Sequence, residues 1–320
     1  MIGRRVLGQR GLPAPVIQGG KSAARAWYRP TAGRRVFPNA LIVGAQRAGT
    51  TSLFRYLVRH PAVMGPHLTK GVHYFDTGFD HNPDWYRSHF PTQAAVQRIG
   101  DQQGVAPIVL EGSPYYLFHP GVPARIAGSL PNTKIMIVLR DPAARARSHH
   151  KHEQERGFES LDFAAALAAE PERLAGSELA LRRDPLAVDF EHQHHSYVAR
   201  GRYGSQVERY LRYFPSEQVL IVWSEALSSA PDQTMRAVFE FLDLPPLESA
   251  EYPRFNARKY EEPTDEVSRW LADQFADSDD HLEELVSMRL PWRRGATTDD
   301  LTQTHRHPDT QSLVTATAQS

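Results

Sequence analysis

One short segment, residues 41–53 with the sequence LIVGAQRAGTTSL, constrains the fold of this chain more than any other. It starts as an apolar run typical of a buried strand, passes through a loop bounded by Gly44 and Gly49, and continues with helical patterning. A strand that leads into a helix through a glycine loop leaves backbone N–H groups free at the helix N-terminus, where they bind anions. The segment therefore predicts an α/β protein with an anion site at this loop.

The residues around the second glycine distinguish this loop from an ordinary nucleotide P-loop, which carries Lys and then Ser or Thr directly after that glycine. Here Thr50 and Thr51 follow Gly49, and the cation, Arg47, lies inside the loop. Arg47 places a fixed positive charge beside the phosphate that the amides and hydroxyls would hold. A glycine turn without a ligand is the alternative interpretation, and the arginine together with the run of hydroxyl residues argues against it.

A second anion site is predicted where the apolar run 134–139 ends at Arg140. Ligands of open α/β folds gather at the carboxyl edge of the sheet, and Arg140 stands at that edge, with Ser148 on the helix that follows. Asp141 suggests a magnesium ligand, but its neighbour Pro142 favours a helix N-cap. Two anion sites on one nucleotide, without a well-placed magnesium ligand, suit 3′-phosphoadenosine 5′-phosphosulfate (PAPS) rather than ATP.

Short apolar runs typical of strands recur along the chain and are separated by helical patterning, which predicts a central parallel sheet flanked by helices on both faces. The predicted strands are residues 40–43, 107–110, 134–139 and 218–223. Asn82-Pro83 and Asp141-Pro142 are typical helix starts, because a capping side chain precedes a proline at the first helical position. An apolar stripe over residues 203–214 predicts a helix that packs on the core and ends before Pro215.

Composition limits the classes of function. Lys plus Arg and Asp plus Glu both number 37, so the formal net charge is zero and gives no support to nucleic-acid binding. The chain has no cysteine, which excludes disulfides, a thiolate nucleophile and cysteine metal sites. No apolar run approaches the roughly 18 residues of a membrane span, so we expect a cytoplasmic protein without a transmembrane segment.

The distribution of charged and apolar residues predicts three regions. Residues 1–36 contain basic residues and no acid, which predicts a flexible N-terminal arm, with peripheral contact to anionic lipid or an anionic substrate as the alternative. Residues 37–294 carry the apolar periodicity of a folded domain. Residues 295–320 are rich in Thr, Ser, Gln and Asp without that periodicity, and are predicted to form a disordered tail.

Six segments occur in the order in which one enzyme family carries them: LIVGAQRAGTTSLFRYLVRHP, VHYFD, LEGSPYYLFHP, KIMIVLRDPAARARSHH, GRYGSQVERYLRYFP and VLIVWSEAL. With these segments the chain resembles the PAPS-dependent sulfotransferases, in particular bacterial members related to the heparan sulfate N- and 3-O-sulfotransferases. The resemblance extends over about residues 38–292 and implies a P-loop-like sulfotransferase fold.

The resemblance also implies a role for each anion site. Residues 44–52 match the family's 5′-phosphosulfate loop, with Arg47 at a position where the family often has Lys. Arg140 and Ser148 match the pair that binds the 3′-phosphate. The cofactor-binding residues predicted in this way are Gly44, Gln46, Arg47, Ala48, Gly49, Thr50, Thr51, Ser52, Arg140 and Ser148.

The implied enzyme transfers a sulfuryl group from PAPS to an acceptor hydroxyl or amine and requires no metal. The implied acceptor is a small molecule or glycan, namely a carbohydrate or a glycosylated or lipid-linked metabolite. Such a transfer requires positioning of two oxygens, stabilisation of the departing charge and removal of a proton. Arg47 can stabilise the leaving phosphate as a fixed charge.

Two positions depart from the family pattern. Gly71 stands where the heparan sulfotransferase relatives have a glutamate two residues before the histidine, here His73, and Gly112 stands where they have a lysine. His73 is the first candidate for the general base, because imidazole titrates near neutral pH, and a purely structural role is its alternative. Lys70 is a further catalytic candidate, or binds the sulfonate or the acceptor.

These departures leave alternatives open. Asp76 and Glu111 are alternative bases, and a protein that binds PAPS or its product without catalysis is an alternative function. A third candidate function is that of an ATP-dependent P-loop kinase or hydrolase, which the missing lysine after Gly49 disfavours. The histidine-rich stretches 149–152 and 192–195 suggest metal binding, but no cysteine and no H-E-x-x-H motif accompanies them, so no metal site is predicted.

Overall fold

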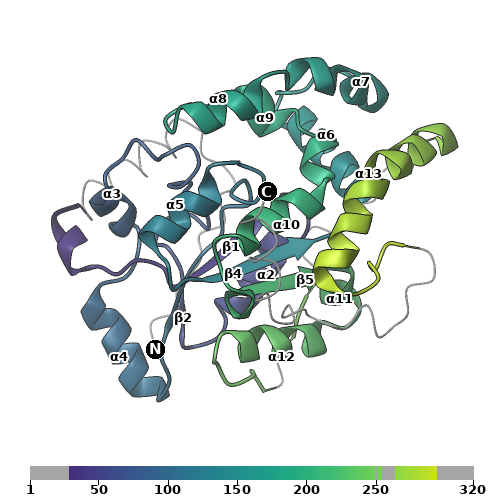
Figure 1. The fold of residues 1–320 in the computed structure, drawn as a ribbon. Helices are drawn as coiled ribbons and strands as arrows, with labels where there is room; N and C mark the ends of the chain where they lie inside the picture. Colours follow the sequence, from purple (N-terminus) through teal and green to yellow (C-terminus); the bar gives the residue numbers. More distant parts are fainter. Residues whose placement is uncertain (1–28, 249–250, 254–263, 294–320) are drawn as a thin grey trace, which may run out of the picture.

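The structure is a computed structural model that describes residues 29–248, 251–253 and 264–293. Its centre is a five-stranded sheet in the order β2-β3-β1-β4-β5, with every neighbouring pair parallel (Figure 1). The strands are β1 (Ala40–Gly44), β2 (Val63–Met64), β3 (Ile108–Glu111), β4 (Lys134–Leu139) and β5 (Val219–Trp223). The predicted parallel sheet and its four strands are confirmed, whereas the edge strand β2 is too short to give a periodic signal.

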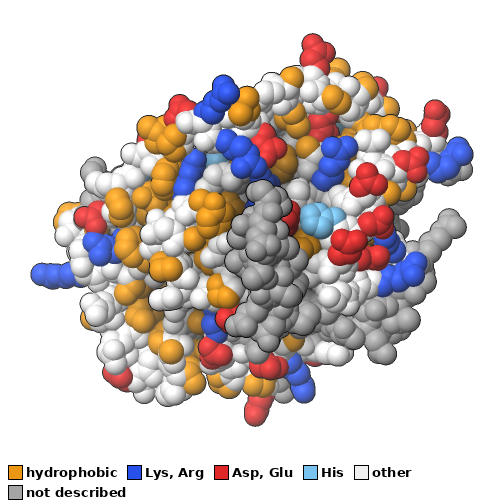
Figure 2. Space-filling view, in the orientation of Figure 1, with side chains coloured by type: hydrophobic (Ala, Val, Ile, Leu, Met, Phe, Trp, Pro, Cys, Tyr) orange, Lys and Arg blue, Asp and Glu red, His pale blue; other side chains and the backbone are white. Residues whose placement is uncertain are grey.

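Helices cover both faces of the sheet, and α10 and α12 lie on opposite sides of it in Figure 1. The α-helices are α2 (Thr50–Leu57), α3 (Pro83–Arg87), α4 (Gln93–Gln103), α5 (Val122–Ser129), α6 (Pro142–Glu155), α7 (Phe163–Arg173), α8 (Ser177–Arg183), α9 (Phe190–His194), α10 (Tyr203–Leu211), α11 (Ser224–Ser229), α12 (Pro231–Phe241) and α13 (Asp265–Val286). Short 3₁₀ helices are η1 (Arg29–Arg34), η2 (Ala199–Gly201) and η3 (Ser216–Gln218). Within the described residues, no helix combines the length and the apolarity needed to cross a membrane. On the face in Figure 2, basic and acidic side chains are interspersed, in keeping with their equal numbers.

The last part of the predicted arm packs on the folded body. Helix η1 contacts α3, and Arg35 forms an isolated antiparallel bridge with Thr92. Arg35 is 9% exposed and donates a hydrogen bond to the carbonyl of Phe90. The folded part therefore begins before residue 37, the boundary expected from the sequence. The earlier part of the arm and the predicted tail 295–320 lie outside the described residues.

Two local predictions are confirmed by hydrogen bonds and burial. Asn82 Oδ1 accepts from the Trp85 N–H at 2.8 Å and caps α3, and Asp141 Oδ1 accepts from the Ala144 N–H at 2.6 Å and caps α6. Residues 203–211 of the predicted stripe form α10, whose core-facing side chains are buried, and Phe214 is buried just after the helix ends. The spacing of the apolar residues therefore places this helix on the sheet as expected.

Parallel pairing brings the carboxyl ends of β1, β4 and β5 to one edge of the sheet. Gly44 is level with Ile137, and Leu139 is level with Trp223. All of β1 and nearly all of β4 is buried, as expected of central strands with helices on both faces. The segments that leave these three strands therefore begin side by side, which positions the site described below.

Gly44 is required by a close approach of the chain. The Leu117 N–H donates to the Val43 carbonyl at 2.7 Å, which brings Leu117 against the end of β1. A Cβ atom on Gly44 would lie 2.4 Å from the Leu117 Cβ. We predict that Gly44→Ala lowers the free energy of unfolding by about 1–3 kcal/mol, the usual cost of overpacking, as measured by denaturant unfolding.

Gly128→Ala is the matched control, because no atom lies within 4 Å of the position that its Cβ would take. This substitution on α5 should leave the free energy of unfolding unchanged or raise it by up to about 1 kcal/mol, because alanine favours the helix. Wild-type stability in the Gly44→Ala protein would contradict the packing account.

Candidate active site

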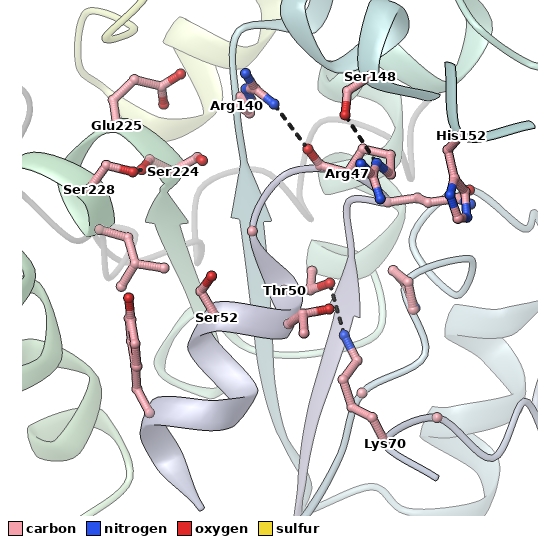
Figure 3. Close-up of a pocket in the computed structure, with 18 of the residues that line it drawn as sticks. Arg47, Thr50, Ser52, Lys70, Arg140, Ser148, His152, Ser224, Glu225 and Ser228 are labelled. Atoms are coloured by element: carbon pink, nitrogen blue, oxygen red, sulfur yellow. Dashed lines mark hydrogen bonds between the residues drawn. The ribbon is translucent and has the colours of Figure 1, made fainter. Parts of the chain in front are cut away.

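A cavity of about 630 Å³ opens at the carboxyl edge of the sheet (Figure 3), and its size is typical of a small-molecule site. Its wall is formed by residues that follow β1, β3, β4 and β5, and by the segment around residues 70–73. The lining residues are Gln46, Arg47, Gly49, Thr50, Thr51, Ser52, Tyr56, Lys70, Gly71, His73, Gly112, Pro114, Arg140, Ser148, His152, Ser224, Glu225, Leu227 and Ser228.

The predicted anion loop forms one wall of the cavity. Gly49 has a φ of 103° and Arg47 a φ of 71°, and α2 begins at Thr50. Glycine adopts this left-handed region without strain, whereas arginine there is uncommon and is typical of a functional loop. The N–H groups of Ser52 and Leu53 donate to the Gly49 carbonyl, which leaves the N–H groups of Thr50 and Thr51 at the start of α2 for an anion.

Arg47 connects the two predicted anion sites. Its Nε donates to Ser148 Oγ at 3.0 Å, and its carbonyl accepts from Nη1 of Arg140 at 3.5 Å (Figure 3). The structure therefore brings the loop after β1, the end of β4 and helix α6 together in one cavity. Of the ten predicted cofactor-binding residues, eight line the cavity, whereas Gly44 and Ala48 are buried and do not.

Lys70 approaches the same loop from the opposite wall. Its Nζ donates to Thr50 Oγ1 at 2.9 Å, and a Cβ atom on Gly112 would lie 3.0 Å from the Lys70 Cε. Burial lowers the pKa of Lys70 to about 7, although the Glu111 carboxylate acts in the other direction. Gly112 thus leaves space for the Lys70 side chain, which supplies a lysine to the region where the family residue is absent.

His73 forms a couple with a buried carboxylate. Its Nδ1 lies 2.8 Å from Asp76 Oδ2, and the side chains of His73 and Asp76 are 42% and 0% exposed. Burial alone would lower the pKa of His73, but the charge of Asp76 and its hydrogen bond hold that pKa above its ordinary value. Since Asp76 accepts the Nδ1 proton, the lone pair of the neutral imidazole is on Nε2. The φ of His73 is 59°, so this residue too lies in the left-handed region.

The absence of a side chain at Gly71 is part of the same arrangement. A Cβ atom on Gly71 would lie 2.8 Å from Ser113 Oγ and 2.9 Å from the Gly112 carbonyl oxygen. It would also lie 3.4 Å from His73 Nε2. The backbone here has no room for the family glutamate unless its neighbours shift, and His73 Nε2 borders the space that such a side chain would enter.

Glu111 organises this wall from beneath and does not line the cavity. The fully buried carboxylate accepts hydrogen bonds from Ser113 Oγ, the two tyrosine hydroxyls of Tyr86 and Tyr116, and the Val72 N–H. Ser113 Oγ in turn accepts from the His73 N–H at 3.1 Å. Glu111 therefore holds the segment that carries His73, and its oxygens face these donors, which removes it as a candidate base. Asp76 is likewise buried behind His73.

Several lining residues were not predicted to belong to this site, among them Tyr56, His152, Ser224 and Glu225. Ser224 and Glu225 directly follow β5, so the rule that located Arg140 applies to them equally. His152 lies one turn after Ser148 on α6 and shares its face. Tyr56 gives no signal in the sequence that distinguishes it from a core aromatic.

The histidine-rich stretches do not converge on the cavity, apart from His152. His192 stacks on Phe118 with ring centroids 4.1 Å apart, and its Nδ1 lies 2.7 Å from the Tyr115 hydroxyl. His194 Nδ1 lies 3.0 Å from Glu153 in a buried network. In the part of the chain that the structure describes, no group of three or more His, Cys, Asp or Glu side chains is arranged to hold a metal ion.

Positive charge dominates the cavity. Arg47, Lys70 and Arg140 line it, and Glu225 is the single carboxylate residue among the described residues that do so. Asp141 caps α6 and does not line the cavity, so it is not placed as a magnesium ligand. Two arginines, a lysine that is partly protonated near neutral pH, the amides at the start of α2 and several hydroxyls fit a ligand that carries more than one anionic group.

We predict that Asp76→Asn lowers the pKa of His73, because the carboxylate that favours the imidazolium is lost. In the wild-type protein this pKa should lie above its usual value of about 6.5. Nuclear magnetic resonance titration of the histidine ring protons measures it, with His73→Gln to assign the resonance. Asp80→Asn is the matched control, because the side chain of Asp80 is 61% exposed and should leave His73 unchanged.

The same pair sets a pH dependence of stability. The folded pKa of His73 is raised, so its stabilisation is complete below about pH 6.5 and is lost as the pH rises through the raised value. In the folded protein, His73 lowers the pKa of Asp76 against the effect of burial. The stability that the Asp76 carboxylate contributes is therefore present above about pH 3.9 and is lost as the pH falls through the lowered pKa. The free energy of unfolding lost in Asp76→Asn should be largest between about pH 4 and 6.5. A loss that does not vary with pH would contradict the pairing.

The part of the chain that lines this cavity is similar to proteins of one known family. The sulfotransferase domain family matches residues 37–273, which include every lining residue of the cavity. Mouse heparan sulfate glucosamine 3-O-sulfotransferase 6 is 34% identical over 227 residues, which cover 71% of this chain and 58% of that protein. Human bifunctional heparan sulfate N-deacetylase/N-sulfotransferase 3 is 30% identical over 217 residues, which cover 65% of this chain and 22% of that protein.

A solved structure gives the same result. The sulfotransferase from Alicyclobacillus acidocaldarius is 30% identical, with a TM-score of 0.59, and the match covers 80% of this chain and 98% of that chain. The present chain spans less than two thirds of the length of the two curated relatives. Because the family match covers well over half of the chain and all of the cavity, this protein belongs to the sulfotransferase family.

Proposed function

We propose that this protein transfers a sulfuryl group from PAPS to a hydroxyl group of a glycan or another glycosylated acceptor. The observation that carries the proposal is the meeting of Arg47, Arg140 and Ser148 in one cavity. A donor with phosphate groups at both its 5′ and 3′ positions requires two adjacent anion-binding groups, and this cavity supplies them. Membership of the sulfotransferase family supports the same class of reaction.

On the donor side, each cation would bind a different part of PAPS. The amides at the start of α2 and Arg47 would hold the 5′ end of the donor, and Arg140 with Ser148 would hold its 3′-phosphate. In the transfer, the S–O bond between the sulfuryl group and the 5′-phosphate of PAPS would break. Adenosine 3′,5′-bisphosphate would then leave, and the negative charge that grows on its 5′-phosphate has to be stabilised. Arg47 is permanently charged and stabilises that phosphate without giving up a proton. Lys70, whose Nζ donates a hydrogen bond to Thr50 Oγ1, would contact the sulfonate.

On the acceptor side, His73 is the proposed base. Asp76 fixes the imidazole so that Nε2 faces the space over Gly71, and the 42% exposure of the His73 side chain allows an acceptor hydroxyl to reach it. The acceptor O–H would donate its proton to Nε2 while the oxygen attacks the sulfuryl sulfur. The imidazolium that forms is stabilised by the buried Asp76 carboxylate.

The proposed acceptor class follows from the names of the relatives. The curated relatives are named for heparan sulfate, one of them for the 3-O position of its glucosamine. We propose a carbohydrate hydroxyl on this basis.

Calorimetric titration with adenosine 3′,5′-bisphosphate, the desulfated product, and with ATP plus Mg²⁺ tests the donor site. We predict that the wild-type protein binds the bisphosphate more tightly than ATP plus Mg²⁺. Arg47→Ala should weaken binding of the bisphosphate by about tenfold to a hundredfold, the effect of one lost hydrogen bond to a charged group. Arg212→Ala removes an arginine that is 64% exposed directly after α10, and this variant should bind the bisphosphate like the wild type. Preference for ATP plus Mg²⁺ would contradict the assignment of PAPS and favour a P-loop kinase or hydrolase.

Transfer from labelled PAPS to a panel of glycans tests the base. His73→Ala should bind the bisphosphate like the wild type but transfer the label at least about a hundredfold more slowly, the usual contribution of a general base. The wild-type rate should rise with pH through the raised pKa of His73, because only the neutral imidazole accepts the proton. Near-normal turnover of His73→Ala would contradict its role. A wild-type protein that binds the bisphosphate but labels no acceptor would favour a donor-binding protein without catalysis.

A further inference from the structure

One carboxylate oxygen of Glu225 accepts a hydrogen bond, whereas the other has no hydrogen-bond partner among the described residues. Glu225 is the second residue of α11, directly after β5, and it lines the cavity. Its Oε1 accepts from the Asp141 N–H at 3.0 Å, which ties it to the turn that follows Arg140. Its Oε2 is buried and has no hydrogen-bond partner among the described residues. A buried carboxylate oxygen without a donor is costly, so a ligand that brings a donor to it is favoured.

The surroundings of Glu225 place it beside the proposed 3′-phosphate site. Burial and the charge of Asp141 raise the pKa of Glu225, whereas hydrogen bonds from the backbone N–H groups of Asp141 and Glu225 and, least of all, the charge of Arg140 act in the other direction. Figure 3 shows Glu225 and Arg140 at the same end of the cavity, away from Lys70. A negative oxygen next to an anion site distinguishes between ligands, because it repels a phosphate and attracts an O–H or N–H group.

In a ribonucleotide whose 3′-phosphate lies on Arg140 and Ser148, the nearest hydroxyl of the ligand is the neighbouring 2′-OH. Carboxylates that hydrogen-bond ribose hydroxyls at the carboxyl edge of a parallel sheet are a recurrent solution in α/β folds. If the phosphate were on the 2′ oxygen instead, its charge would face Glu225. Glu225 would therefore attract the 3′,5′ isomer of the bisphosphate through its 2′-OH and repel the 2′,5′ isomer through its 2′-phosphate.

We propose that Glu225 determines the positional specificity of the nucleotide site: Oε2 accepts a hydrogen bond from the ribose 2′-OH and excludes a 2′-phosphate. The inference rests on the proposed function, since it places a 3′-phosphate on Arg140. It assigns to α11 a recognition role that is separate from the anion loop. The residue is a specificity determinant and takes no part in the transfer of the sulfuryl group.

Three ligands test the proposal by calorimetry without any turnover: adenosine 3′,5′-bisphosphate, its 2′-deoxy analogue, and adenosine 2′,5′-bisphosphate. The wild-type protein should bind the first at least about tenfold more tightly than either of the others, because each of them loses a hydrogen bond to a charged group or adds a repulsion. The readout is the ratio of dissociation constants within one protein. A merely structural role of Glu225 would weaken all three ligands alike and leave the ratios unchanged.

Two substitutions separate the charge from the hydrogen bond. Glu225→Gln keeps an oxygen for the Asp141 N–H and a polar group for the 2′-OH but removes the negative charge, so the penalty for the 2′,5′ isomer should shrink several-fold while the deoxy penalty largely remains. Glu225→Ala should abolish both penalties and bring both ratios to within about threefold of one. Glu217→Gln is the matched control, because it removes the same negative charge at an exposed position that precedes the first residue of β5. This variant should keep the wild-type ratios of dissociation constants.

The possible results distinguish the inference from the function on which it rests. Wild-type ratios in both Glu225→Gln and Glu225→Ala would overturn the role of Glu225 and leave the proposed donor site intact. A wild-type protein that binds none of the three ligands would overturn the donor site and, with it, this inference. Tight binding of the deoxy analogue by the wild type would also overturn the inference, because Oε2 would then take no hydrogen bond from the 2′-OH.

Discussion

The parallel pairing of β1 with β4 is the constraint on which the rest of the site depends. It sets Gly44 level with Ile137, so the loop after β1 begins beside the strand that ends at Arg140. Because α6 follows that strand directly, its face presents Ser148 to Arg47 at 3.0 Å. A different register would move Arg140 along the edge and separate the two anion sites. The cavity is therefore a consequence of the sheet and not of its loops alone.

The opposite wall depends on one buried carboxylate. Glu111 gathers Val72, Ser113 and two tyrosine hydroxyls, and through Ser113 it fixes the backbone of His73. In this setting the glycines at 71 and 112 are linked to their neighbours, because Lys70 fills the space over Gly112 and His73 borders the space over Gly71. The departures from the family pattern thus belong to a wall that still offers an amine and an imidazole to the cavity.

Much of this arrangement could be predicted from the sequence, and the reasons why the rest could not are physical. Strands β1, β3, β4 and β5 and the caps at Asn82 and Asp141 have local signals, because burial and capping leave a mark on neighbouring residues. The anion loop and Arg140 follow from a general rule about sheet edges. The contacts of Lys70 with Thr50, and of His73 with Asp76 and Ser113, depend on how loops pack, and no periodicity records that. The same rule applies to Glu225, which follows β5. In the sequence, however, a single glutamate after a strand cannot be distinguished from a solvent-exposed acid.

A crystal structure of the protein with adenosine 3′,5′-bisphosphate would test the central claim most directly, namely that one cavity binds two phosphate groups of one nucleotide. We expect the 5′-phosphate on the amides of residues 49–51 beside Arg47, and the 3′-phosphate within hydrogen-bond distance of Arg140 and Ser148. Density for the nucleotide with its 3′-phosphate turned to solvent, or bound away from Arg140, would contradict it.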